Sequence, residues 1–491
     1  MRKNLTVIFT VGALVLSGCG GDSSSPVVPA NTGSGNTGGG GGGASSLSIN
    51  PATATVGVGG SVSFSASGGS GSYTYSTSSG SMSSGVLTAT STGTATVTVN
   101  DGTTTVTATV HIKGPSIMTL SGDTSCFALP GNDYQCFGYD PVPLYNTSVG
   151  VDNGHDLPIE IDPAIFISGL SGLASAPKGF APESTCFKGG INSNVYCYGN
   201  NQNGALGQSN AVNSSVPLMV PGLPAVAKVV RGNDHVCVLT VGGKVYCWGN
   251  NDYNQLGVTT PAFNCDSALS SCATSPQGVL TTPGGVVDVA AGYNTTCAVM
   301  LDGTVKCWGQ DNLGQCGVGS TASTRTVPTT VSTIAGGATA VTVSMSGKGA
   351  CAVVSGGLKC WGGVAAPLSD ALGTGLGASS TPSFINNMGA GSFVTQVSSG
   401  LGHICAIQSG AVKCFGFNSE GELGNGSTID SSVPVVVSGL FGISNISLGK
   451  DHACATNAGR VTYCWGRNDR GQLGRGDNTN SDVPVLVSQW K

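Results

Sequence analysis

Cysteine has the richest chemistry of any residue in this chain, and its spacing is regular. Fourteen of the 18 cysteines form pairs whose members lie nine to eleven residues apart, and a new pair begins every 49 to 60 residues. Metal sites favour CxxC or Cys/His clusters, and no CxxC occurs. The spacing therefore predicts one disulfide across each of seven β-hairpins. The predicted pairs are Cys126 with Cys136, Cys186 with Cys197, Cys237 with Cys247, Cys297 with Cys307, Cys351 with Cys360, Cys405 with Cys414, and Cys454 with Cys464.

The four remaining cysteines have separate interpretations. Cys265 and Cys272 lie in an insertion, and we expect them to form an eighth disulfide that closes this loop. Cys316 replaces a leucine in a repeated turn, GQDNLGQCG against GNNDYNQLG, which indicates a small buried side chain more than a reactive thiol. Cys19 ends the first apolar segment of the chain.

Residues that could catalyse a reaction do not converge in the sequence. His235, His403 and His452 each stand two residues before a hairpin cysteine, which marks them as repeat positions. Glu160 and Asp162 would share one face of a strand and could form a carboxylate pair, but an exposed strand face explains them as well. No P-loop, HExxH or GxSxG pattern occurs. We therefore expect no catalytic residue, no metal ion and no cofactor, and a protein that is not an enzyme.

The composition excludes further classes of function. Only 9% of the residues are charged, with 19 basic and 24 acidic side chains and a net charge of −5. Such a chain lacks the clustered positive potential that neutralises nucleic-acid phosphates, so we expect no DNA or RNA partner. The 79 glycines, together with many Ser, Thr and Val residues, favour short strands joined by tight turns over helices.

The first residues predict export and a membrane anchor. Arg2 and Lys3 precede an apolar stretch of about eleven residues, which is too short to span a membrane. The stretch ends in Leu16-Ser17-Gly18-Cys19, which resembles the lipobox of bacterial lipoproteins. The resemblance implies a signal peptide over residues 1–18 and a lipid on Cys19. It also implies an extracytoplasmic location on the cell envelope, at the outer membrane or cell surface if the organism is Gram-negative, with contact to the membrane through the lipid alone.

Two segments lie between the lipobox and the cysteine repeats. Residues 19–46 are rich in Gly and Ser and predict a flexible linker. Residues 47–114 contain alternating segments such as TATVTVN and TTTVTATVHI, separated by turn residues, which predicts a small β-sandwich. This pattern looks like a bacterial immunoglobulin-like domain. We favour a spacer role for it over adhesion.

From Gly114 onward each cysteine pair belongs to a larger repeated unit, and seven units are present. A Gly-Asn-rich turn ending in Leu-Gly follows the pair in most units, and each unit has the content of about four short strands. An aromatic residue follows every second cysteine, and we expect it to pack between units: Phe137, Tyr198, Trp248, Trp308, Trp361, Phe415 and Trp465. A proline is expected to open an apolar strand in each unit: Pro158, Pro217, Pro276, Pro328, Pro382, Pro434 and Pro484.

These units, above all HVCVLTVGGKVYCWGNNDYNQLG and HACATNAGRVTYCWGRNDRGQLG, resemble the repeats of the regulator of chromosome condensation family. The resemblance implies an all-β fold in which residues 117–491 form a seven-bladed β-propeller. Because the first unit lacks a preceding Pro-led strand, we expect Val483 to Gln489 to complete the first blade and close the ring.

Three irregular segments interrupt the repeats, within residues 139–156, 258–275 and 363–380, and they should emerge on one face. Tyr139, Tyr145 and Phe263 are the candidate contact residues on these segments. We expect a monomeric, non-enzymatic surface lipoprotein whose propeller binds a protein or a glycan. The alternative is an extracytoplasmic enzyme or enzyme inhibitor, since relatives in this family include a guanine-nucleotide exchange factor and a secreted inhibitor of β-lactamases.

Overall fold

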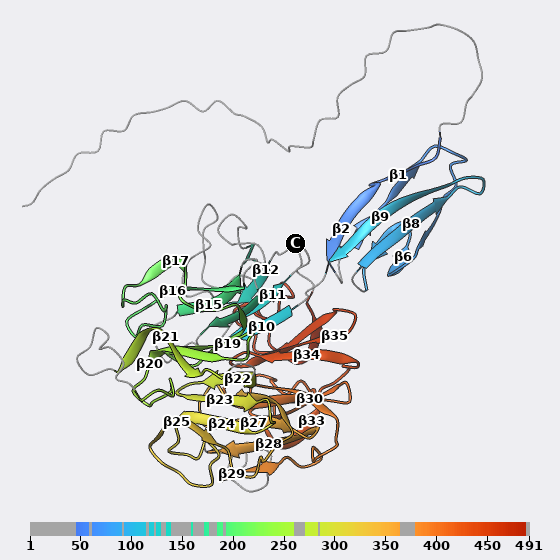
Figure 1. Ribbon diagram of the computed structural model, residues 1–491. Coiled ribbons are helices and arrows are strands. Elements are labelled where there is room, and N and C mark those ends of the chain that lie inside the picture. Colours follow the sequence, from blue (N-terminus) through green and yellow to red (C-terminus); the bar gives the residue numbers. More distant parts are fainter. Residues whose placement is uncertain are drawn as a thin grey trace, which may run out of the picture. The chain divides into compact units, whose positions relative to one another are not determined.

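The structure is a computed structural model in which all described elements are β-strands (Figure 1). No helix in this described part is long and apolar enough to cross a membrane. The described residues are 46–57, 61–90, 93–113, 117–121, 124–128, 134–138, 159–160, 171–175, 184–189, 193–259, 271–282, 285–363 and 379–487. The lipobox with Cys19 and the linker before residue 46 lie outside them.

The first described segment forms three small sheets, ordered β1-β4, β2-β9-β8-β5 and β3-β7-β6. Its strands are β1 (Ser48–Asn50), β2 (Thr53–Gly57), β3 (Ser61–Ser63), β4 (Ser65–Ser67), β5 (Thr74–Thr77), β6 (Ser81–Ser83), β7 (Val86–Thr88), β8 (Gly93–Asn100) and β9 (Thr105–Lys113). Along β8 the buried Ala95, Val97 and Val99 alternate with exposed or half-buried threonines, so one face of the sheet supplies the core. The Asp101 carboxylate accepts backbone N–H bonds from Thr103 and Thr104, which fixes the β8–β9 turn.

Seven four-stranded sheets follow within the described residues, and each is a simple antiparallel meander of consecutive strands. We call them blades 1 to 7 in chain order. The first strands are β10 (Ile117–Ser121), β14 (Ser171–Ser175), β18 (Val226–Arg231), β22 (Val286–Gly292), β26 (Ala338–Val343), β30 (Val394–Ser399) and β34 (Ile443–Leu448). The second strands are β11 (Thr124–Ala128), β15 (Ser184–Gly189), β19 (His235–Thr240), β23 (Thr295–Met300), β27 (Gly349–Val354), β31 (His403–Gln408) and β35 (His452–Asn457).

The outer half of each blade consists of its third and fourth strands. The third strands are β12 (Tyr134–Gly138), β16 (Asn194–Gly199), β20 (Val245–Asn250), β24 (Val305–Gln310), β28 (Gly357–Gly362), β32 (Ala411–Gly416) and β36 (Thr462–Gly466). The fourth strands are β13 (Ile159–Glu160), β17 (Ser214–Met219), β21 (Cys272–Leu280), β25 (Thr324–Thr330), β29 (Ser379–Phe384), β33 (Ser431–Val436) and β37 (Ser481–Leu486).

The first strands of successive blades are neighbours, which makes them the inner wall of a ring. The ring closes because β10 of blade 1 lies beside β34 of blade 7, as Figure 1 shows. The second strands lie between neighbouring blades, and every residue of β19 and β27 is buried. Burial on both faces explains why segments such as HVCVLT and GACAVV carry no polar alternation. An all-β propeller of four-stranded repeats is therefore the fold.

Neighbouring blades are tied together by buried tryptophans. Trp248, Trp308, Trp361 and Trp465 have no exposed surface. Each indole N–H donates to a turn carbonyl of the preceding blade: to Ala205, Gln255, Gln315 and Glu422, at 2.8 to 2.9 Å. The expected packing of these aromatic residues between units is thus observed, with a hydrogen bond that satisfies the only polar atom of the ring.

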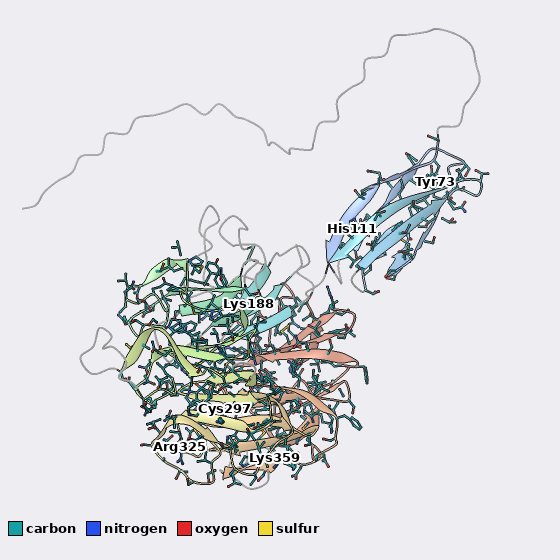
Figure 2. All side chains as sticks on the ribbon, viewed as in Figure 1. Tyr73, His111, Lys188, Cys297, Arg325 and Lys359 are labelled. Atoms are coloured by element: carbon teal, nitrogen blue, oxygen red, sulfur yellow. A yellow bond between two sulfur atoms is a disulfide. The ribbon has the colours of Figure 1, made fainter. Side chains whose placement is uncertain are left out.

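The hairpin cysteines face each other across the second and third strands. Six of the predicted pairs are disulfides among the described side chains, with Cα atoms 4.0 to 4.1 Å apart, and Cys297 of one pair is labelled in Figure 2. They join Cys186 to Cys197, Cys237 to Cys247, Cys297 to Cys307, Cys351 to Cys360, Cys405 to Cys414, and Cys454 to Cys464. The two cysteines of each pair stay directly opposite each other although the length of the hairpin turn between them varies by two residues.

The two other predicted pairs lie partly outside the described residues. In blade 1, Cys126 and Cys136 are direct register partners, but their side chains are not among the described ones. Cys272 is disulfide-bonded, whereas Cys265 lies outside the described residues. The pairing of Cys265 with Cys272 and the bridge in blade 1 therefore stay predictions.

Two expectations about the fourth strand were wrong. In blades 2 to 7 the proline stands inside the strand and does not open it: Pro434, for example, is the fourth residue of β33, whereas Pro158 of blade 1 lies outside the described residues. The register between β32 and β33 is interrupted there, and proline is tolerated because this strand is the outer edge of its sheet.

The second error concerns the closure of the ring. The final strand β37 pairs with β36 in its own blade and does not complete blade 1. The repeat begins one strand earlier than the cysteine pattern indicates, since each inner strand precedes its hairpin. Every blade is therefore built from one continuous segment, and the ring closes by packing between the first and last blades.

Removing one hairpin disulfide should lower stability without opening the ring. For the double variant Cys351→Ala with Cys360→Ala we expect a loss of about 2.5 to 3 kcal/mol, because the unfolded chain regains the freedom that the short closed loop removes. Chemical denaturation under non-reducing conditions would measure this loss. Cys316→Ala is the control, since it removes one buried sulfur and no disulfide; a loss equal to that of the control would contradict the role of loop closure.

Candidate functional site

The turn after the third strand is built around one asparagine. Asn418 Oδ1 accepts the N–H of Leu423 at 2.8 Å, and its Nδ2 donates to the carbonyls of Ser427 and Ile429. The same bond to the residue five positions later is made by Asn201, Asn251 and Asn468. These bonds explain the recurring Gly-Asn-rich turn that ends in Leu-Gly, and they make this turn part of the rigid frame.

Blade 4 carries a variant of this turn. Asp311 replaces the asparagine, accepting the N–H of Cys316 at 2.9 Å and the Nε–H of Arg325, which Figure 2 labels, at 2.6 Å. Cys316 is fully buried and is not in a disulfide. Burial raises the pKa of its thiol well above the usual value, and Asp311 raises it further. A protonated, inaccessible thiol is a poor nucleophile, so Cys316 is a packing residue.

The three repeat-position histidines are buried at the start of their second strands. Burial lowers the pKa of His235 and His452 to about 3 and that of His403 to about 4, so all three are neutral at pH 7. His235 Nε2 lies 2.8 Å from Thr296 Oγ1 of the next blade. A Cβ on Gly232 would overlap the His235 ring, which accounts for the glycine three residues before it. No group of three metal-ligating side chains occurs among the described residues.

A hollow of about 420 Å³ opens on the face where each first strand turns into the second. Its walls come from these turns in blades 4, 5 and 6 and from the ends of the third strands beside them. The pairing of His403 with Gly416 places both kinds of segment at the same edge of a blade. Tyr293, Lys348 and Phe417 line the hollow, one from each of the three blades.

Two glycines allow the aromatic walls to stand close to the backbone. A Cβ on Gly402 would overlap the Phe417 ring, and one on Gly347 would overlap the side chain of Tyr293. Gly347 also has a φ of +66°, which L-residues with side chains rarely adopt. Its carbonyl accepts a hydrogen bond from Gln315 Nε2 at 3.3 Å, so blade 4 and blade 5 are joined at the floor of the hollow.

Blade 5 departs from the repeat at this hollow. In blade 6 the turn is closed by a bond from Gly400 N to the His403 carbonyl, whereas in blade 5 the equivalent bond runs from Ser344 N to the Gly349 carbonyl. The blade 5 turn is therefore two residues longer, and Lys348 lies within this extension. The irregular segment of residues 363–380 begins at Gly363, which also lines the hollow. The longer turn of blade 5 and the first residue of the irregular segment, both departures from the repeat, thus line the same hollow.

The predicted contact residues Tyr139, Tyr145 and Phe263 lie outside the described residues. The lining residues Tyr293, Lys348 and Phe417 were missed because they are far apart in sequence. Four units have a glycine five residues before the first cysteine, but blades 1, 2 and 5 have Ser121, Ala181 and Ser346 there, so this position does not single out blade 5.

Glu422 of blade 6 is a buried acid at a position that holds glutamine in blades 3, 4 and 7. Its Oε2 accepts the N–H of Glu420 at 2.8 Å, as Gln255, Gln315 and Gln472 accept the N–H two residues before them. The glutamines also donate through Nε2, which an ionised carboxylate cannot do. Burial, together with the negative charges of Asp451 and Glu420, raises the pKa of Glu422 to about 7. Asp451 itself pairs with Lys450 and Arg467.

The comparison with known families identifies the repeats. The description "Regulator of chromosome condensation (RCC1) repeat" matches residues 192–239, 242–299, 302–353, 409–456 and 459–491. A second description of the same repeat matches residues 226–255 and 286–315. The matched segments include all or part of each of blades 2 to 7.

Two known proteins match about half of this chain in sequence. The chain is 27% identical over 254 residues to the Ultraviolet-B receptor UVR8 of Arabidopsis thaliana, covering 50% of this chain and 53% of that protein. It is 30% identical over 287 residues to the human E3 ubiquitin-protein ligase HERC2, covering 54% of this chain and 5% of that protein. The chain thus spans about half of UVR8 and a small part of HERC2.

Two solved structures have the same fold. Human WBSCR16 superposes with a TM-score of 0.57 at 23% identity, covering 72% of this chain and 88% of its own. Prp20p of Saccharomyces cerevisiae superposes with a TM-score of 0.55 at 18% identity, covering 76% and 87%.

Replacing Glu422 by glutamine should stabilise the protein in a pH-dependent way. The pKa of Glu422 is about 7 in the folded protein, whereas the ordinary pKa of a glutamate side chain is 4.5. Burial of the charged form therefore lowers the free energy of unfolding, and this loss grows from about pH 4.5 and is complete above pH 7. At pH 8 we expect Glu422→Gln to gain up to about 3 kcal/mol in the free energy of unfolding, and at pH 4.5 almost nothing. Denaturation curves at both pH values test this, and an equal gain at both would contradict the assignment.

Proposed function

Since the chain carries RCC1 repeats on an RCC1-like β-propeller, we propose that it is a non-enzymatic binding protein of the cell envelope. Its propeller would bind a protein or a glycan through the face that carries the turns between first and second strands. The single observation that carries this proposal is the hollow across blades 4, 5 and 6, where two departures from the repeat coincide. A constant frame with local variation is the usual design of repeat proteins that bind partners.

The frame is suited to this role. The tryptophan bonds between blades and the asparagine-centred turns hold the face in one conformation. Preorganised surfaces lose little conformational entropy on binding, which favours affinity. The buried histidines and Cys316 belong to this frame: His235, His452 and Cys316 have no exposed surface, and His403 is 2% exposed. These features support a binding role over catalysis.

An extracytoplasmic location fits the disulfides. Six hairpin disulfides in one chain persist only where the environment is oxidising. The lipobox-like Leu16-Ser17-Gly18-Cys19 and the basic start of the chain support a lipid anchor at Cys19. The sheets of residues 46–113 would then act as an immunoglobulin-like spacer between anchor and propeller.

The relatives offer a second candidate. Prp20p has binding properties to Gsp1p and histones, and human HERC2 is named an E3 ubiquitin-protein ligase. Protein partners among relatives support a protein partner here. An exchange factor, another enzyme, or an enzyme inhibitor on the same propeller is the alternative, and turnover of a substrate by the purified chain would favour it.

A charge placed on the proposed face should abolish partner binding. Leu401 lines the hollow, and Leu401→Asp should prevent capture of envelope or host components by the full chain, because an acid would be desolvated in the interface. The control is Leu301→Asp in the β23–β24 hairpin turn, at the opposite end of a blade, where the side chain is 70% exposed. Affinity capture followed by mass spectrometry compares the two. Equal capture by both variants would contradict the choice of face.

Replacing the lipobox cysteine should remove the anchor. In a bacterium that lipidates exported proteins, the wild-type chain should incorporate a clickable fatty-acid analogue and fractionate with membranes. Cys19→Ala should lose the label and become soluble after export, whereas Cys316→Ala should keep it. Labelling of the Cys19→Ala variant at the wild-type level would rule out Cys19 as the lipid site.

A further inference from the structure

The hollow across blades 4, 5 and 6 has mainly apolar walls. The side chains of Tyr293, Leu313, Leu401 and Phe417 line it. Leu313 is 38% exposed, and the others are half-buried, so their apolar surfaces are open to a partner. The volume of about 420 Å³ lies within the range of about 300 to 1,000 Å³ that is common for ligand sites. This volume is large enough to hold one aromatic side chain.

Gln310 and Gln315, two of the polar side chains that line the hollow, already bond to the protein. Gln315 accepts the N–H of Leu313 and donates to Asn312 Oδ1 at 3.1 Å and to the Gly347 carbonyl at 3.3 Å. Gln310 accepts a bond from Asn294 at 3.4 Å. A sugar needs several open donors and acceptors for its hydroxyl groups, and these amides are engaged elsewhere. The lining therefore favours a protein side chain over a glycan.

Lys348 supplies one positive charge at this site. It lines the hollow, and it forms no ion pair with any residue in the described part of the chain. No Asp or Glu occurs among the described lining residues, and His403, which also lines it, is neutral at pH 7. The hollow is thus apolar with a single cation, although the whole chain has a net charge of −5. A carboxylate is the complementary group.

We propose that this hollow binds an aromatic side chain of a protein partner, with a carboxylate beside that side chain paired to Lys348. The inference rests on the proposed binding function of this face and names the chemistry that the face recognises. The carboxylate would come from the C-terminus of the partner or from an adjacent Asp or Glu. Both sources place a negative charge within a few ångströms of an aromatic ring.

Small probes test this chemistry on the purified full chain. We expect N-acetyl-L-tryptophan to bind with a dissociation constant of about 0.1 to 10 mM in a ligand-observed NMR titration. N-acetyl-L-tryptophanamide, which lacks the carboxylate, should bind about two to five times more weakly, as expected for a partly exposed ion pair. N-acetyl-aspartyl-tryptophanamide restores a carboxylate on the residue before the tryptophan. If it binds as tightly as N-acetyl-L-tryptophan, an adjacent acidic residue can supply the carboxylate; if it binds as weakly as N-acetyl-L-tryptophanamide, the C-terminus of the partner must supply it.

Variants assign the effect to Lys348. Lys348→Gln should bind the acid and the amide equally, whereas Lys306→Gln, the same change on β24 of blade 4 and not among the lining residues, should keep the preference for the acid. An unchanged preference in Lys348→Gln would overturn the role of Lys348. Absence of binding by every tryptophan probe, or stronger binding of N-acetylneuraminic acid, would overturn the proposal.

The outcomes separate this inference from the proposed function. If Leu401→Asp abolishes partner capture but no tryptophan probe binds, the face binds partners by another chemistry and the present inference is wrong. If the probes bind with the expected dependence on Lys348 but capture is indifferent to Leu401→Asp, the site exists and the proposed use of the face is wrong.

Discussion

The contact between a buried indole N–H and a turn carbonyl of the preceding blade is the interaction on which this structure depends. Each tryptophan fills the space between two sheets and satisfies its polar atom on the neighbouring blade. The accepting residue belongs to a turn centred on an asparagine or, in blade 4, on Asp311, so the turn and the sheet packing fix one another. A blade is thereby held in place by its neighbour and not by its own core alone.

This arrangement separates stability from recognition. The disulfides lie within the hairpins, the tryptophans pack between blades, and the asparagine-centred turns, although they share an edge of the blade with the turns between first and second strands, are closed by their own hydrogen bonds. Those turns can change length without loss of the frame, as blade 5 shows with its extension from Ser344 to Gly349. The hollow forms where such a change coincides with an irregular segment. Lys348 and Leu401, which line the hollow, take no part in the disulfides, the tryptophan bonds or the asparagine-centred turns.

The sequence predicted the repeating features well because each has a local cause. Cysteines opposite one another in a hairpin, an aromatic residue after the second cysteine and a turn ending in Leu-Gly all follow from contacts within one unit or with the next. The start of the blade was misplaced because inner strands such as Val226–Arg231 and Val286–Gly292 share only an apolar pattern. The hollow could not be predicted, since the curvature of the ring brings together Tyr293, Lys348 and Phe417 from three blades.

The proline of the fourth strand has a consequence for behaviour at high concentration. In blades 2, 4, 6 and 7 an exposed valine directly precedes it: Val216, Val327, Val433 and Val483. The unpaired backbone groups of such an outer strand could pair with an edge strand of a second molecule, and a ring of blades has one such edge in every blade. Proline removes one N–H from the edge, and the break in register disrupts the remaining row of donors. Each of these four blades thus carries its own protection against fibre-like self-association.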